Sequence, residues 1–151
     1  TWKKYRNLIT WADQIIFIYP IWWSGMPAML KGFIDRVFTA GFAYSYGKRG
    51  LIGHLQGKSA WIITTHNTPA FLTPFIQDYG KVLKKSSSEI IGIKPVTHTQ
   101  LSDTENSSER KTPALLRSKI AKYRRQYLTF LVYYDFFTKD YLVTKSQINL
   151  H

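Results

Sequence analysis

An apolar run that ends in a tryptophan-rich loop, followed at once by a helix, constrains the fold of this chain more than any other feature. Residues 15–19 read Ile-Ile-Phe-Ile-Tyr and stop at Pro20. Such a near-continuous run fits a strand covered on both faces, as in a parallel sheet. Pro27 suits the first turn of a helix, where its missing N–H breaks no hydrogen bond. An apolar stripe at helical spacing then follows at Leu30, Phe33, Ile34, Val37 and Phe38.

The loop between this strand and this helix is a candidate binding site. Ligands of open α/β sheets bind where loops leave the carboxyl ends of strands. The loop contains Trp22 and Trp23, which are either core aromatics or part of a ligand site. Because neighbouring residues at a strand end point to opposite sides, we expect at least one of the two rings to face the loop opening.

The remaining segments continue the alternation of helices and strands. A second strand is predicted at residues 59–65, which end in the polar loop His66-Asn67-Thr68-Pro69. Further helices are predicted at residues 1–11, 74–85 and 113–127, a long loop at 42–53, and a strand at 90–98. Pro95 either weakens the last strand or marks it as an edge strand. The order predicts an α/β protein with right-handed parallel crossovers.

Length predicts one domain, although two features do not fit a complete one. A helix comes first, which indicates that an earlier part of an α/β unit is absent. Residues 127–151 form an aromatic-rich tail without clean periodicity, best interpreted as a strand pair or an adventitious extension. We therefore divide the chain into the carboxyl-terminal portion of an α/β domain at residues 1–126 and an atypical tail at 127–151.

Composition and motifs exclude several functions. The chain has no cysteine, so disulfides and thiolate sites are excluded, which fits a cytoplasmic protein. Its net charge of +12 suits polyanions, but without a nucleic-acid module an ordinary basic surface is favoured. The histidines show no metal-ligand spacing, and we expect no metal. No serine-hydrolase elbow, dinucleotide fingerprint or Walker loop is present.

Residues 20–38 resemble the NAD(P)H:quinone oxidoreductase family of flavodoxin-like flavoproteins. The matching positions are Pro20, Trp22, Trp23, Gly25, Pro27, Ala28, Leu30, Lys31, Gly32, Phe33, Asp35, Arg36, Val37 and Phe38. Weaker similarity extends over residues 1–126. The resemblance implies a flavodoxin-like parallel sheet with helices on both faces, whose first strands are absent from this chain. It also implies bound FAD or FMN, NAD(P)H as electron donor, and a homodimer with flavin sites at its interface.

The resemblance assigns cofactor contacts to two loops. They are Pro20, Ile21, Trp22, Trp23 and Ser24 in the first, and Thr64, Thr65, His66 and Asn67 in the second. Backbone groups of residues 21–24 would lie along the isoalloxazine, and Trp23 would line the ring pocket. Backbone N–H groups at Thr64 and Thr65 would bond the pyrimidine carbonyls and stabilise charge that develops on reduction.

Several positions depart from the family. Many members have Gly-Gly after Thr-Thr, where this chain has His66 and Asn67. The Tyr and His that assist hydride transfer are not evident, and Phe71 stands near the expected Tyr as a candidate substrate-pocket residue. His66 is the one candidate catalytic group, with a solvated loop histidine as the alternative. The family's first strand and its phosphate loop would lie upstream, which would leave the strand at residues 15–19 with an unpaired edge.

The leading hypothesis is an oxidoreductase in which a flavin takes hydride from NAD(P)H and passes two electrons to a quinone or similar acceptor. The alternative is a non-catalytic flavodoxin-like accessory subunit that regulates a membrane transport partner, for which a basic surface would be suited. No specific nucleic-acid partner is expected. The sequence does not distinguish FAD from FMN as the cofactor, or NADH from NADPH as the electron donor.

Overall fold

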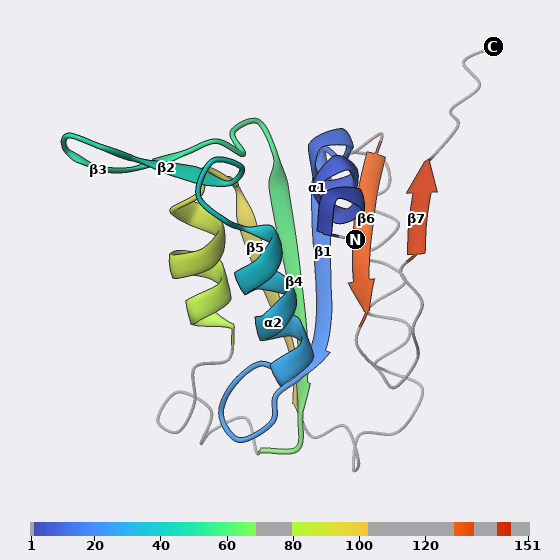
Figure 1. Cartoon of the computed structure of the whole chain (residues 1–151). Coiled ribbons are helices and arrows are strands. Elements are labelled where there is room, and N and C mark those ends of the chain that lie inside the picture. The colour runs from blue at the N-terminus through green and yellow to red at the C-terminus, as the bar shows by residue number, and fades with distance from the viewer. Residues whose placement is uncertain (1, 69–79, 103–128, 135–141, 146–151) are drawn as a thin grey trace.

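The computed structural model describes residues 2–68, 80–102, 129–134 and 142–145 (Figure 1). Its elements in chain order are α1 (Trp2–Trp11), β1 (Gln14–Pro20), α2 (Ala28–Val37), β2 (Tyr44–Gly47), β3 (Gly50–Gly53), β4 (Ser59–His66), the π-helical segment η1 (Leu83–Glu89), β5 (Val96–Ser102), β6 (Thr129–Tyr134) and β7 (Leu142–Lys145). The predicted first helix, first and second strands, and the helix after Pro27 are confirmed.

Five strands form one sheet in the order β5-β4-β1-β6-β7. Strands β5, β4, β1 and β6 run parallel, and β7 runs antiparallel to β6. The predicted parallel α/β sheet is therefore confirmed. In the β1–β4 register, Pro20 lies opposite Thr65, so both strands end at the same edge of the sheet (Figure 1). That edge carries both loops in which the sequence predicts ligand contacts.

The two faces of the sheet carry separate apolar clusters, as expected for strands buried on both sides. One face of β1 and β4 packs with side chains of α1, α2 and η1 in the larger cluster, which includes Ile9, Phe17, Leu30, Ile62 and Leu83. The other face carries Ile16, Trp61, Ile63 and Leu101. All described helices thus contribute to one face. The helix predicted at residues 113–127 lies outside the described residues.

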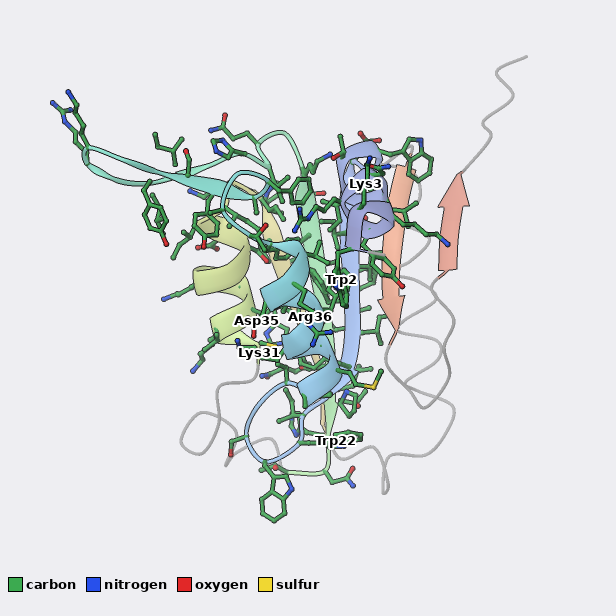
Figure 2. The ribbon with its side chains drawn as sticks, viewed as in Figure 1. Trp2, Lys3, Trp22, Lys31, Asp35 and Arg36 are labelled. Atoms are coloured by element: carbon green, nitrogen blue, oxygen red, sulfur yellow. The ribbon has the colours of Figure 1, made fainter. Side chains whose placement is uncertain are left out.

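Helices α1 and α2 are joined by two arginines. The Arg6 guanidinium donates to the Arg36 carbonyl at 3.1 Å and to Thr39 Oγ1 at 3.0 Å. The Arg36 guanidinium lies 5.1 Å from the ring centre of Trp2, a cation–π distance (Figure 2). On the exposed side of α2, Lys31 and Asp35 lie four residues apart and form a solvent-exposed ion pair at 2.6 Å.

Three segments differ from the sequence prediction. The expected loop at residues 42–53 contains the β2–β3 hairpin, in which Gly47 lies opposite Gly50 across a two-residue turn. Its strands are too short to show a clear alternation. The predicted strand at 90–98 begins only at Val96, because Pro95 has no N–H for a ladder, while Ile91 and Ile93 are buried outside the sheet. The helical segment near Lys85 continues to Glu89, and residues 74–79 lie outside the described part.

The outer edge of β1 is paired, contrary to the unpaired edge expected from the sequence. Residues of β6 lie opposite β1 in parallel register from Gln14↔Phe130 to Ile18↔Tyr134. The β6 sequence, Thr-Phe-Leu-Val-Tyr-Tyr, consists of the β-branched, aromatic and aliphatic residues that suit a sheet. Because β1 is apolar and buried, pairing of its backbone groups by any such strand is strongly favoured. The tail thus contributes the strand pair that was one of its two interpretations.

Candidate functional site

The two predicted loops leave the sheet side by side and are joined by a hydrogen bond. The Ile21 N–H, directly after the end of β1, donates at 2.8 Å to the carbonyl of Thr65, the last residue of β4 that lies opposite β1. This bond fixes the start of the first loop on the end of β4. The structure therefore brings the two groups of predicted cofactor residues to one place (Figure 1).

The first loop folds into a tight turn with a strained backbone. Trp22 and Gly25 exchange two backbone hydrogen bonds, each of 3.0 Å. The two residues between them, Trp23 and Ser24, have φ values of 49° and 67°, the sign that a type I′ turn requires at both central positions. Left-handed backbone costs a residue with a side chain about 1–2 kcal/mol. Strain of this kind is typical of ligand sites, where surrounding structure holds it in place.

The turn's own hydrogen bonds determine which backbone groups it can offer to a ligand. The N–H groups of Ile21, Trp22 and Gly25 are used inside the protein. Those of Trp23 and Ser24 donate to no acceptor within the part of the chain that the structure describes. Of the backbone N–H groups at residues 21–24 that were predicted to contact a ligand, only those of Trp23 and Ser24, at the tip of the turn, can therefore donate to one.

Both tryptophans of the turn are exposed. Trp22 is 50% exposed and Trp23 102% exposed, so neither is a core aromatic. Figure 2 shows Trp22 at the carboxyl edge of the sheet, beyond the end of β1. The core-aromatic interpretation is therefore wrong for both rings, and it stays a prediction that one of them faces the loop opening. That Trp23 lines a flavin pocket stays a prediction, because no described residue of this chain covers its ring.

The side chain of Thr64 is not available to a ligand. It is fully buried, and its Oγ1 shares a hydrogen bond of 3.0 Å with Nε2 of His98 on β5. Only the backbone of Thr64 can serve the role that the resemblance implies. Thr65 is partly buried, and Asn67 is exposed at the start of the second loop. No local sequence pattern connects His98 with this site, since it lies 34 residues from Thr64.

His66 is a buried, neutral histidine. It is 6% exposed, and its Nδ1 lies 3.1 Å from the Thr68 carbonyl. A carbonyl only accepts, so Nδ1 carries the proton and Nε2 is an acceptor. Burial lowers the pKa of the imidazole, against a smaller opposing effect of the Thr68 bond. The solvated-histidine interpretation is therefore wrong, and the side chain ties the second loop to its own backbone. Phe71 lies outside the described residues.

We also searched the described residues for a metal site and for a membrane-spanning helix. Within them, no three His, Asp or Glu side chains gather as metal ligands would. No helix among those described is long and apolar enough to cross a membrane.

The parallel sheet, with two joined loops at its carboxyl edge, defines an open α/β protein of the kind that binds ligands at this edge. Residues 3–127 match the family described as having a flavodoxin-like fold, and the chain belongs to that family. The expected fold class is thereby confirmed.

Relatives carry the names that the resemblance predicts. A ribosyldihydronicotinamide dehydrogenase-like protein of Penicillium crustosum is 45% identical over 65 residues, which are 38% of this chain and 24% of the relative. NAD(P)H dehydrogenase (quinone) 1 of Cavia porcellus is 48% identical over 54 residues, 36% of this chain and 20% of the relative. The matches thus span a quarter or less of these two curated relatives.

Two solved structures extend the similarity over most of the chain. Smu.1420 of Streptococcus mutans is 64% identical, with a TM-score of 0.74 over 82% of this chain and 65% of that protein. An NAD(P)H:quinone oxidoreductase of Methanothermobacter marburgensis is 30% identical, with a TM-score of 0.65 over 80% of this chain and 62% of that protein. The resemblance to quinone oxidoreductases is confirmed.

Proposed function

We propose that this protein acts in flavin-dependent oxidation of NAD(P)H, with two electrons passing to a quinone or similar acceptor. The observation that carries the proposal is the strained, tryptophan-bearing turn tied to the end of β4 by the bond between Ile21 and Thr65. The names of the relatives give this site its chemistry: NAD(P)H dehydrogenase (quinone) for one, and FMN-dependent NADH:quinone oxidoreductase for another.

The residues at this edge fit a flavin. Exposed aromatic rings suit the flat isoalloxazine, and the tip amides of Trp23 and Ser24 suit its polar rim. The buried, neutral His66 adds no charge beside the ring. When bound, FAD or FMN supplies the hydride chemistry, and the protein positions and polarises the ring. FMN is the cofactor named for three relatives that match this chain.

A direct test is the absorbance spectrum from about 350 to 500 nm of protein purified without added cofactor, followed by titration with FMN. We expect a flavin band or saturable FMN binding. Replacing Trp23 by alanine should raise the FMN dissociation constant about two- to tenfold, the equivalent of an aromatic contact of about 0.5–1.5 kcal/mol. Trp23→Phe should retain most of the affinity.

The matched control is Trp11→Ala, which removes a second exposed tryptophan, 40% exposed, from the end of α1. It should leave FMN binding unchanged. Equal losses in both variants would mean that Trp23 has no specific role. A chain that binds no flavin, yet associates stably with a membrane transport protein, would favour the accessory-subunit alternative.

We also propose a homodimer. The β2–β3 hairpin stands apart from the main sheet (Figure 1) and exposes Tyr46, Leu51 and Ile52 by 78%, 47% and 51%. A two-stranded hairpin is at best marginally stable alone in water, and exposed apolar patches mark interaction sites. We expect sedimentation to give a dimer, and the double variant Leu51→Asp, Ile52→Asp to shift it to monomer. Wild-type protein that stays monomeric at high concentration contradicts the proposal.

A further inference from the structure

We propose that His98 is a positioning residue of the flavin site, which acts through Thr64 on the two loops at the carboxyl edge of the sheet. This inference rests on the proposed function. His98 lies on β5, two strands away from the tryptophan turn, and was not among the residues that the sequence indicated. Its effect would pass through the hydrogen bond between its Nε2 and Thr64 Oγ1, at 3.0 Å.

The contact joins strands across one face of the sheet. His98 lies opposite Ile62 in the β4–β5 register, so its ring reaches along β4 toward the strand end to meet Thr64. Tyr19 of β1 lies opposite Thr64 on the other side. The side chains of Thr64 and Tyr19 are 0% and 1% exposed. Polar atoms of three neighbouring strands thus gather in the interior just before the strands end.

Gly80 covers this polar group at close range. A Cβ at Gly80 would stand 3.1 Å from His98 Nε2 and 3.2 Å from the Tyr19 hydroxyl, and the φ of this residue is +83°. The glycine backbone therefore lies against both side chains where a larger residue would displace them. The bond between His98 and Thr64 is partly buried, which strengthens it relative to an exposed bond.

From Thr64, a short series of bonds leads to the turn. Thr64 is followed by Thr65, whose carbonyl accepts the Ile21 N–H at 2.8 Å. Ile21 is followed by the turn in which Trp23 and Ser24 present their amides. A shift of Thr64 would therefore move both loops together. Because binding geometry is sensitive to small displacements of its supporting residues, the bond to His98 should influence flavin affinity without any contact to flavin.

A second hydrogen bond between the same two strands provides a matched control. Trp61 Nε1 on β4 donates to Thr99 Oγ1 on β5, also at 3.0 Å, and this bond is buried where the bond at His98 is partly buried. Trp61 stands three residues before Thr64 in β4, so its side chain lies on the opposite face of the sheet. If any buried bond between β4 and β5 supported the site equally, the loss of this one would have the same effect as the loss of the bond at His98.

The test is a double-mutant cycle on the whole chain, with FMN as the probe. We expect His98→Leu and Thr64→Val each to raise the FMN dissociation constant about five- to tenfold, and the double variant to show no further rise. His98→Gln, whose amide can still bond Thr64, should recover most of the affinity, and Thr99→Val should retain it. A second readout, independent of ligand, is amide hydrogen exchange at residues 65–67, which should quicken in His98→Leu and not in Thr99→Val.

Each outcome decides between the two proposals. Additive losses in the double variant, or equal losses in Thr99→Val, would overturn the role of His98 and leave the proposed function intact. A wild-type chain that binds no FMN would overturn the proposed function. Amide exchange alone would then test whether His98 positions the loop. Unchanged exchange at residues 65–67 in His98→Leu would overturn the positioning role in either case.

Discussion

Ending the chain after residue 128 is expected to destabilise it by about 3 kcal/mol or more, because β1 then loses the strand that pairs along its outer edge. The β6 register covers five residues of β1, from Gln14 to Ile18. All but one of these five side chains are buried, so water cannot easily replace the lost partners of the backbone. Unpaired N–H and C=O groups beside an apolar strand also form a template for association with other chains.

The measurement is urea unfolding followed by circular dichroism, with light scattering to detect association. A chain that ends after residue 145 keeps β6 and β7 and is the matched control, which should unfold like the full chain. Adding a synthetic peptide of residues 129–145 to the shortened chain should restore part of the lost stability. Coincident unfolding midpoints for the shortened and full chains would show that β6 contributes nothing to β1.

The parts of the fold that the sequence predicted are those set by burial on two sides. β1 and β4 are near-continuous apolar runs, and α2 has a clear apolar stripe after Pro27. A run of this kind has few alternatives to a covered strand. Elements set by turns or partners were missed. The β2–β3 hairpin has exposed strands of four residues each, and the start of β5 depends on where Pro95 ends the preceding segment.

The candidate site shows the same division. The resemblance brought the loops after β1 and β4 together, because adjacent parallel strands end at one edge. It did not give the conformation within the loops. The positive φ of Trp23 and Ser24 is not a property that either residue favours, so local sequence would not predict it. The bond between Thr64 and His98 depends on register across two strands, which no local pattern contains.

Replacing Gly53 by alanine should be among the most damaging single changes in the chain. A Cβ at this position would overlap the Ile91 carbonyl carbon and lie 2.5 Å from the Gly92 nitrogen. Both atoms are backbone and cannot turn aside as a side chain would. The same segment accepts the Leu55 N–H at the Ile91 carbonyl, 2.9 Å away, so moving it breaks a second contact. We expect a loss of about 3 kcal/mol, the upper part of the range for overpacking.

The control is Gly32→Ala, which adds the same methyl group inside α2. Among the described residues, no atom other than those of its chain neighbours and of the nearby backbone of α2 lies within 4 Å of its Cβ position. Alanine is the better helix former by about 1 kcal/mol, so this variant should be slightly more stable than the original chain. Urea unfolding of both variants measures the contrast. Since the added group is identical, opposite signs would show that the end of β3 is held by backbone packed on backbone. A Gly53→Ala chain as stable as the original would mean that the hairpin does not rest on residues 91–92.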